Sequence, residues 1–481
     1  MNPHPDPLPE GEGELHWLGI AELAPLLQRR QLSPVELTDH YLERIERLDG
    51  QLNSYRLVMA DAARAGAEQA EQEIFRGEHR GRLHGVPLGM KDLFEIAGVP
   101  CTMGSRILAE CVPERDATVV ARLRQAGAVI LGKQTMHEFA FGVTSENPHY
   151  GDVRNAWDTQ RVAGGSSGGT GVAVAAGLCV AGLGSDTGAS IRAPASFCGT
   201  VGLKPTYGRV SRAGALPLSW SLDHVGPLAR SVTDCAIILQ AIAGPDPRDG
   251  SASTREVPSY TRDLTGDVAG LVLGVPSEHF FDLVEPGVVE CVRAAIRVLE
   301  GLGARLEEVP VPHAQHAQMA GTAIMSSEAA TWHAEWLRSR PDEYGPDVLL
   351  RIRHGLLVRA TEYLLAQQMR SLIQSDFTAA FERGVQAIVA PTLPLVAPRI
   401  GSTFDKGGSF DLAPRSVITR TTVPANLAGL PAASLPCGFS EGLPVGLQVI
   451  GPAFGEPIVL QVAHAYEQAT DWHLRRPPLA A

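Results

Sequence analysis

The 481-residue chain has few lysines, no paired cysteine motif and no long apolar run. Its seven cysteines are scattered without a CxxC pair, and no His/Cys cluster has zinc spacing, so we expect reduced thiols, no metal and no cofactor. No apolar stretch reaches the ~18 residues that indicate a membrane span. The first residues also lack the basic start and apolar stretch of a secretory signal. These absences predict a cytoplasmic protein that does not bind a membrane.

The charge balance is acidic, with 53 Asp and Glu against 41 Lys and Arg. Binding to nucleic acid needs clustered basic residues, so direct contact with nucleic acid is not expected. Only Lys91, Lys133, Lys204 and Lys406 are lysines, and three of these lie in Gly- and apolar-rich stretches. A buried lysine can lose its proton, which arginine does not do. A lysine such as Lys91, after Gly85–Met90, therefore suggests a use for the neutral amine.

The order of apolar and polar segments predicts an α/β fold. Apolar runs at 128–131, 271–275 and 387–390 are typical of buried strands, and 288–302 and 457–468 have helical character. Such alternation indicates a single domain, over residues 15–478, with a central mixed, twisted sheet covered by helices. Residues 1–14 are predicted to be a flexible tail. The Gly-, Ser- and Asp-rich stretch 399–416 is predicted to be a mobile loop, with a role as a lid left open.

Chemistry is concentrated in two Gly- and Ser-rich segments, GGSSGGT at 164–170 and GSDTGASIRAP at 184–194. A phosphate-binding loop would need a Lys after the glycines, and none is present. Residues 164–168 match the GxSxG elbow of α/β-hydrolases, but the required histidine would have to be His464 or His473, neither in a suitable loop. A serine activated by lysine is the third option. Since no lysine follows a serine by three residues, Lys91 is the candidate base from elsewhere in the chain.

Residues 164–206, GGSSGG…GSDTGASIRAPASFCGTVGLKPT, resemble the amidase signature family. Further segments resemble the family in the expected order: 33–53, 85–92, 132–140, 221–227 and 424–431. The resemblance implies a Ser–cisSer–Lys triad. By motif position the nucleophile is Ser190, the bridging serine is Ser166 after a cis peptide bond, and the base is Lys91.

The resemblance further implies an acyl-enzyme mechanism. A neutral Lys91 would take the Ser190 proton through Ser166 and return it to the leaving amine. The backbone N–H groups of Thr187, Gly188, Ala189 and Ser190 would form the oxyanion hole. Ser167, Asp186 and Arg192 are expected to support these groups without reacting.

Several residues have other interpretations. Lys91 could instead form a structural ion pair with Asp92, Lys133 and Lys204 are expected to be structural, and His137 is expected to be a packing or loop residue. Ala189 stands where most family members have Gly. An alanine would be strained at that position if its φ were positive. His224 stands where amidotransferase subunits usually have Gln, and this favours a stand-alone hydrolase.

The sequence-based hypothesis for function is a serine amidase acting on neutral aryl or alkyl amides, with esters and carbamates (urethanes) as further substrates. It rests on the apolar stretch Met319–Trp336, which a plain core helix would explain equally well. The substrate pocket is predicted to include Met136, Gly142, Met325 and Trp332. A small-molecule substrate, no nucleic acid, and a monomer or homodimer are expected. The alternatives are the glutaminase (A) subunit of a tRNA-dependent amidotransferase, and a non-catalytic binding protein on an amidase fold.

Overall fold

A computed structural model describes residues 15–262, 264–402 and 417–480. The described strands form one 11-stranded sheet in the order β1-β3-β2-β4-β6-β5-β10-β11-β9-β7-β8. Pairs β2–β3, β2–β4, β7–β8 and β7–β9 are parallel and the others are antiparallel. The strands are β1 (Tyr55–Val58), β2 (Pro87–Lys91), β3 (Val129–Gln134), β4 (Ala181–Asp186), β5 (Val201–Lys204), β6 (His224–Ala229), β7 (Val272–Pro276), β8 (Arg305–Val309), β9 (Ala387–Pro391), β10 (Ala432–Ser440) and β11 (Leu443–Ile450).

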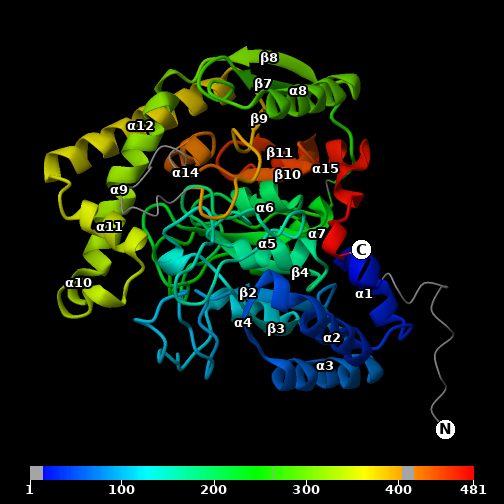
Figure 1. Cartoon of the computed structure of the whole chain (residues 1–481). Coiled ribbons are helices and arrows are strands. Elements are labelled where there is room, and N and C mark those ends of the chain that lie inside the picture. Colours follow the sequence, from blue (N-terminus) through cyan, green and yellow to red (C-terminus); the bar gives the residue numbers. More distant parts are fainter. Residues whose placement is uncertain (1–14, 263, 403–416, 481) are drawn as a thin grey trace, which may run out of the picture.

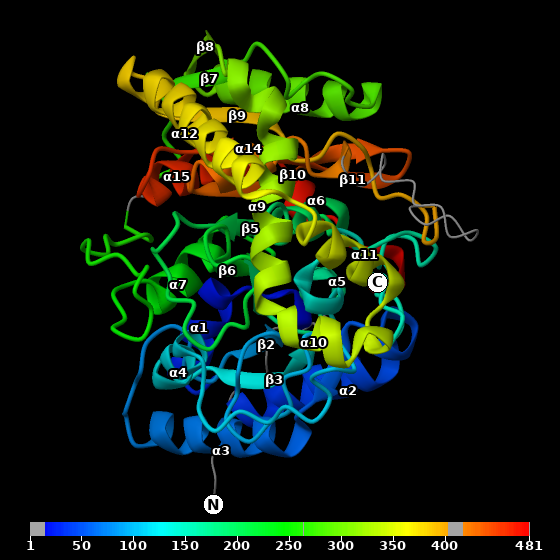
Figure 2. The same cartoon turned by 90° about the vertical axis from the view of Figure 1, so that its left-hand side faces the viewer.

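Helices cover the sheet on both faces. The α-helices of the described residues are α1 (Ile20–Gln28), α2 (Pro34–Leu52), α3 (Ala60–Phe75), α4 (Thr118–Gln125), α5 (Gly168–Ala175), α6 (Arg192–Cys198), α7 (Val232–Ile242), α8 (Pro286–Gly301), α9 (Ala317–Trp332), α10 (Ala334–Ser339), α11 (Pro346–Gly355), α12 (Ala360–Glu382), α14 (Val423–Leu427) and α15 (Glu456–Gln468). Helices α9–α12 form a separate group at one edge (Figure 1). In Figure 2, strands run through the middle of the molecule, with α4, α7 and α15 on one side and α2, α5 and α6 on the other. The predicted mixed α/β sheet covered by helices is confirmed.

Local sequence signals explain where these elements begin. Ser33 caps α2 by accepting hydrogen bonds from the backbone N–H groups of Val35 and Glu36 at 3.0 and 3.3 Å. The helix then buries Leu37, Tyr41 and other apolar side chains on one face. Strands β2, β3 and β4 are buried along their whole length, as their near-continuous apolar runs predict for strands covered on both sides.

The pairing of the central strands positions the active-site segments. In the parallel pair β2–β4, Met90 lies opposite Leu183, so both strands end at the same edge with Lys91 and Ser185. Strand β6 pairs antiparallel with β4 and brings the 219–223 segment to that edge. The Gly- and Ser-rich segments therefore meet the lysine through sheet topology.

Two predictions concern residues outside the described ranges. These are the flexible tail, 1–14, and the mobile loop predicted at 399–416, of which 403–416 lie outside the described residues. The assignment of residues 15–478 to a single domain also stays a prediction. None of the helices in the described ranges is long and apolar enough to cross a membrane.

Candidate active site

The candidate base lies at the end of β2, fully buried. The Lys91 Nζ atom donates to the Ser166 Oγ atom at 2.6 Å and to the Ser185 Oγ atom at 2.8 Å. The Gly165–Ser166 peptide bond is cis. The Ser167 N–H donates to the Ser190 carbonyl oxygen at 3.3 Å, which joins the segment carrying Ser166 to the segment carrying the candidate nucleophile. The three residues of the predicted triad are thus brought to one place from β2, the 164–167 turn and the 187–191 turn.

The surroundings of Lys91 favour its neutral form. Burial lowers the pKa of Lys91 from 10.5 to about 7, while the carboxylates of Asp186 and Asp223 act in the opposite direction. At neutral pH a substantial fraction of this amine is therefore unprotonated. An amine in that state can accept a proton from a serine hydroxyl.

A buried ion pair fixes the turn that carries Ser190. The Arg192 Nη2 atom lies 3.0 Å from the Asp186 Oδ1 atom, and both side chains are fully buried. The Asp186 Oδ2 atom also accepts the Ile191 and Arg192 backbone N–H groups at 3.1 and 3.3 Å. Burial by itself would raise the pKa of Asp186, but Arg192 holds it below its usual value. The negative charge of Asp186 is thereby committed to holding the turn.

A cavity of about 490 Å³ opens beside the candidate nucleophile. Its floor contains the predicted oxyanion-hole residues, Thr187, Gly188, Ala189 and Ser190, and its walls come mainly from α9 and α11. Of the predicted pocket residues, Gly142 and Met325 line it. Met136 and Trp332 do not, and their assignment to the pocket is corrected. Met136 is buried in the core, and Trp332 packs edge-on against the rings of Phe139, His333 and Trp336.

Other residues singled out from the sequence have structural partners. Asp92 pairs with Lys133 at 2.9 Å, both buried, so it does not pair with Lys91. Lys204 donates to the Pro205 carbonyl oxygen at 3.2 Å and to that of Leu430. The His137 Nε2 atom lies 3.0 Å from the Asp347 carboxylate.

Ala189 is not among the residues with positive φ, so the alanine introduces no left-handed strain into the turn. Its side chain is buried against Val143, Ala193 and other apolar groups. The expected distortion of the oxyanion hole is therefore not observed.

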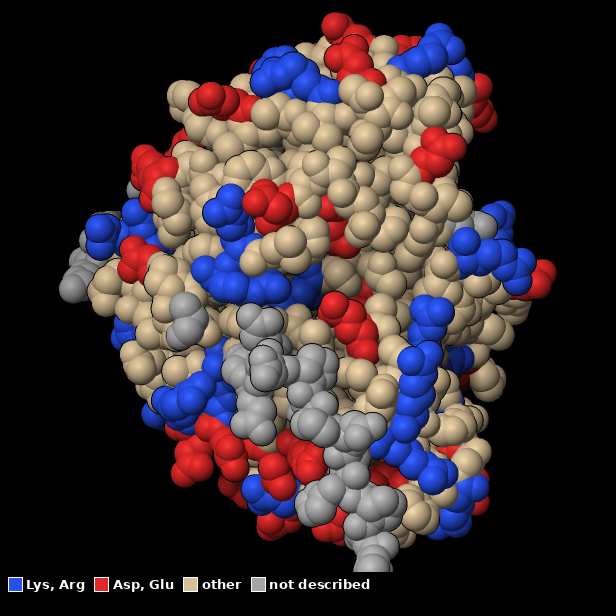
Figure 3. All heavy atoms as spheres, turned by 90° about the vertical axis from the view of Figure 1, so that its right-hand side faces the viewer, with Lys and Arg blue, Asp and Glu red and all other residues tan. Residues whose placement is uncertain are grey.

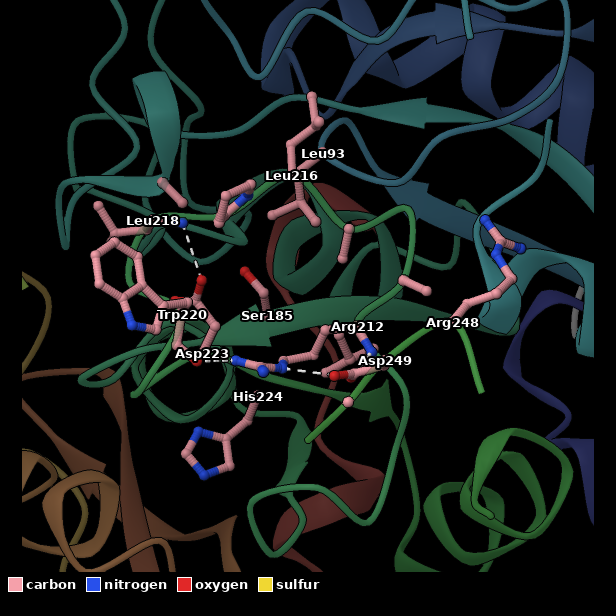
Figure 4. Close-up of a pocket in the computed structure, with 16 residues that line it drawn as sticks. Leu93, Ser185, Arg212, Leu216, Leu218, Trp220, Asp223, His224, Arg248 and Asp249 are labelled. Atoms are coloured by element: carbon pink, nitrogen blue, oxygen red, sulfur yellow. Dashed lines mark hydrogen bonds and ion pairs between the residues drawn. The ribbon is translucent and has the colours of Figure 1, made fainter. Parts of the chain in front are cut away.

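Two residues of the site were not assigned from the sequence. Ser185 accepts from Lys91, and Asp223 accepts from the Thr187 hydroxyl at 2.6 Å. Figure 4 shows both at a second cavity, of about 240 Å³, with the His224 ring turned away from them. Both lie in segments that resemble the family, but only the pairing of β4 with β2 and β6 shows that they approach the lysine.

Comparison with known proteins agrees with this geometry. The Amidase family model matches residues 36–460. The chain belongs to the amidase family. It is an enzyme of the amidohydrolase type, as the resemblance implies.

Relatives within this family narrow the choice of function. The A-type subunit of glutamyl-tRNA(Gln) amidotransferase from Moorella thermoacetica is 45% identical over 97% of this chain and 99% of that protein. The solved structure of the same subunit from Thermotoga maritima is 35% identical, covers 95% of this chain and 96% of its own, and has a TM-score of 0.81. A structure described as a vestigial complex that reveals the origins of an s-triazine catabolic enzyme is 37% identical over 94% of this chain and 98% of its own, with a TM-score of 0.89.

These relatives contradict two expectations from the sequence. The hypothesis of a stand-alone hydrolase of neutral apolar amides and carbamates is wrong, since relatives at 43–45% identity over nearly the full length are amidotransferase subunits. The same relatives contradict the expectation of a small-molecule amide or carbamate alone, with no nucleic acid and a monomer or homodimer. They are named as subunits of an enzyme for glutamyl-tRNA(Gln). The expectation of a stand-alone hydrolase rested partly on His224. In the structure its Nδ1 atom lies 2.6 Å from the Leu222 carbonyl oxygen and its ring packs on Tyr207, so it has a structural role.

Proposed function

We propose that this chain is the amide-hydrolysing A-type subunit of a tRNA-dependent amidotransferase, which releases ammonia from glutamine at Ser190. The observation that carries the proposal is the 45% identity to the A-type subunit of a glutamyl-tRNA(Gln) amidotransferase over almost the whole of both chains. The contact between Lys91 and Ser166 supports it, because a protein that had lost its activity would not need a buried lysine on a serine hydroxyl.

In this proposal Lys91, in its neutral form, accepts the Ser190 proton through the Ser166 hydroxyl. Ser190 attacks the amide carbon, and the backbone N–H groups of Thr187–Ser190 stabilise the oxyanion. Return of the proton to the leaving nitrogen releases ammonia and leaves an acyl group on Ser190. A water molecule, activated by the same relay, then hydrolyses the acyl group.

The cavity beside Ser190 has features that suit glutamine. Its walls are mostly apolar, and Arg351, Arg353 and His354 on α11 line one side. The Arg351 Nη1 atom is held 3.1 Å from the Asp347 Oδ2 atom, which orients the guanidinium group. Guanidinium groups bind carboxylates by charge-assisted hydrogen bonds, so this side of the cavity suits the glutamine carboxylate.

The relatives are named as subunits, and the charge of this chain agrees with a partner that binds the tRNA. The chain has a net charge of −12. On the face shown in Figure 3, Lys and Arg side chains gather in a group left of centre and in a stripe on the right, among separate Asp and Glu groups and wide uncharged areas. Because tRNA binding depends on clustered positive charge, we expect partner subunits to supply most of the tRNA-binding surface.

The test is ammonia release from glutamine by the chain co-purified with its partner subunits, together with amidation of glutamyl-tRNA(Gln). Replacing Ser190 with Ala is expected to abolish both activities. Ser196→Ala, a buried serine of α6 outside the relay, is the matched control and is expected to leave them intact. Hydrolysis of neutral anilides with no release of ammonia from glutamine would overturn the proposal.

A further inference from the structure

Two cavities adjoin the groups around Lys91. Ser190 lines the larger one, of about 490 Å³. Ser185, which accepts a hydrogen bond from Lys91, lines the second, of about 240 Å³. Leu218 lines both and forms part of the wall between them. The groups in this wall can therefore affect the oxyanion turn and the base together.

Asp223 holds this wall in place. One carboxylate oxygen accepts the Thr187 hydroxyl at 2.6 Å, and the other accepts the backbone N–H groups of Leu218 and Ser219 at 2.9 and 3.0 Å. Thr187 begins the turn that ends at Ser190. One side chain thus ties the candidate oxyanion hole to the wall that the two cavities share. Figure 4 shows its contact with Leu218 on the side of the second cavity that faces Trp220.

Asp223 and Ser185 line the same cavity, and Ser185 accepts a hydrogen bond from Lys91, so the Asp223 carboxylate lies near the base. The carboxylates that influence Lys91 are Asp186 and Asp223, and Asp186 is already paired with Arg192. The cation that acts on Asp223 is Arg212, which is itself 3.6 Å from Asp249. Burial raises the pKa of Asp223 to about 6, so the group is still mostly ionised at pH 7. Its negative charge therefore remains available to an ammonium group at Lys91.

We propose that Asp223 is a positioning residue with two tasks in the reaction. It holds the oxyanion turn through the Thr187 hydroxyl, and its negative charge stabilises the protonated Lys91 between the two proton transfers. The first task orients the N–H groups that meet the developing oxyanion. The second keeps the relay able to hold the Ser190 proton until the leaving nitrogen takes it. This inference rests on the amide-hydrolysing role proposed for Ser190.

The test separates the two tasks with two variants. Asp223→Asn removes the charge and keeps the shape: its Oδ1 can accept the Leu218 and Ser219 N–H groups while its Nδ2 donates to the Thr187 hydroxyl oxygen. Thr187→Val removes the hydroxyl but keeps the charge. Asp249→Asn is the matched control, since it neutralises another carboxylate at the same cavity that does not contact Thr187. The rate of Ser190 labelling by a small alkyl fluorophosphonate is measured from pH 5.5 to 9. Labelling needs neither glutamine nor partners, so failure of the proposed substrate would leave this test valid.

In the unmodified chain the labelling rate is expected to rise with pH through the Lys91 pKa of about 7. Asp223→Asn should move the midpoint about half a pH unit to one unit lower, because an ammonium loses a nearby opposite charge. Thr187→Val should lower the plateau by about tenfold with the midpoint unchanged. Asp249→Asn should change neither the midpoint nor the plateau.

The same midpoint in Asp223→Asn as in the unmodified chain, or an equal shift in Thr187→Val, would overturn the proposal. If Asp223→Asn does not fold, Asp223→Glu replaces it. A retained midpoint with a lowered plateau then supports the proposal, and a midpoint shifted downward overturns it.

Discussion

Replacing Lys91 with Met should inactivate the enzyme and stabilise its fold at neutral pH. The pKa of the buried amine falls from 10.5 to about 7, and each pH unit of that interval corresponds to about 1.4 kcal/mol. Keeping the amine in the folded chain at pH 7 therefore costs about 5 kcal/mol. Met fills a similar volume without a charge. It gives up the two hydrogen bonds to Ser166 and Ser185, each contributing about 1 kcal/mol. The expected net gain is about 3 kcal/mol at pH 7.

The pH dependence gives this prediction its sign. Between pH 7 and 10.5 the unfolded chain binds one proton more than the folded chain at this residue, so raising the pH stabilises the unmodified fold. The penalty is fully present below pH 7 and is gone above about pH 10.5. At pH 9 about 2 kcal/mol of it remains, which the lost hydrogen bonds offset. The advantage of Lys91→Met should accordingly shrink from about 3 kcal/mol at pH 7 to about zero at pH 9.

The assay is urea denaturation of the two proteins at pH 7 and pH 9, reported as the difference in the free energy of unfolding. Lys133→Met is the matched control, because Lys133 is also buried but pairs with Asp92. Leaving that carboxylate unpaired should destabilise the fold by about 3–5 kcal/mol. If Lys91→Met were less stable than the unmodified chain at pH 7, or if the difference did not change with pH, the account of a neutral buried amine would be refuted.

Three further predictions concern activity and the turn. The kcat/KM for ammonia release should rise with pH to a plateau with a midpoint of about pH 7, since only the neutral Lys91 accepts a proton. A rate that falls across pH 6–8 would contradict the assignment of Lys91 as the base. Arg192→Lys should lower kcat at least about 100-fold and lower the free energy of unfolding by on the order of 3 kcal/mol, because lysine cannot reproduce the forked hydrogen bonds to Asp186 and Gln448. Near-normal kcat and urea denaturation would show that this network is dispensable. Ala189→Gly should leave kcat within about twofold and destabilise the fold by about 0.5–1 kcal/mol, because Ala189 does not have positive φ. A large gain in kcat would show that the alanine does distort the oxyanion hole.

The apolar pattern of the chain was sufficient to predict the α/β sheet. The strands expected at 271–275 and 387–390 are found at Val272–Pro276 and Ala387–Pro391, and the helix expected at 288–302 is α8, Pro286–Gly301. Burial on both sides selects continuous apolar strands, and amphipathic helices need a stripe of apolar residues. These are local properties, so the sequence displays them directly.

The substrate side of the site was not predictable in the same way. Met136 and Trp332 are apolar residues near motif segments, yet their side chains pack into the core or against other aromatic rings. Arg351, which lines the cavity, lies 161 positions after Ser190 in the sequence and reaches it only because α11 packs on α9. Which side of a helix faces a cavity depends on packing between distant segments.

The sequence by itself determined the fold class through its apolar pattern, and the family through the resemblance of residues 164–206, which also implied the residues of the relay. Only the tertiary structure decided which groups serve Lys91. Asp92 is its neighbour in the chain but pairs with Lys133, whereas Ser185 is 94 positions away and contacts it. Side chains of adjacent strand residues point to opposite faces of a sheet, while the ends of paired strands meet at one edge.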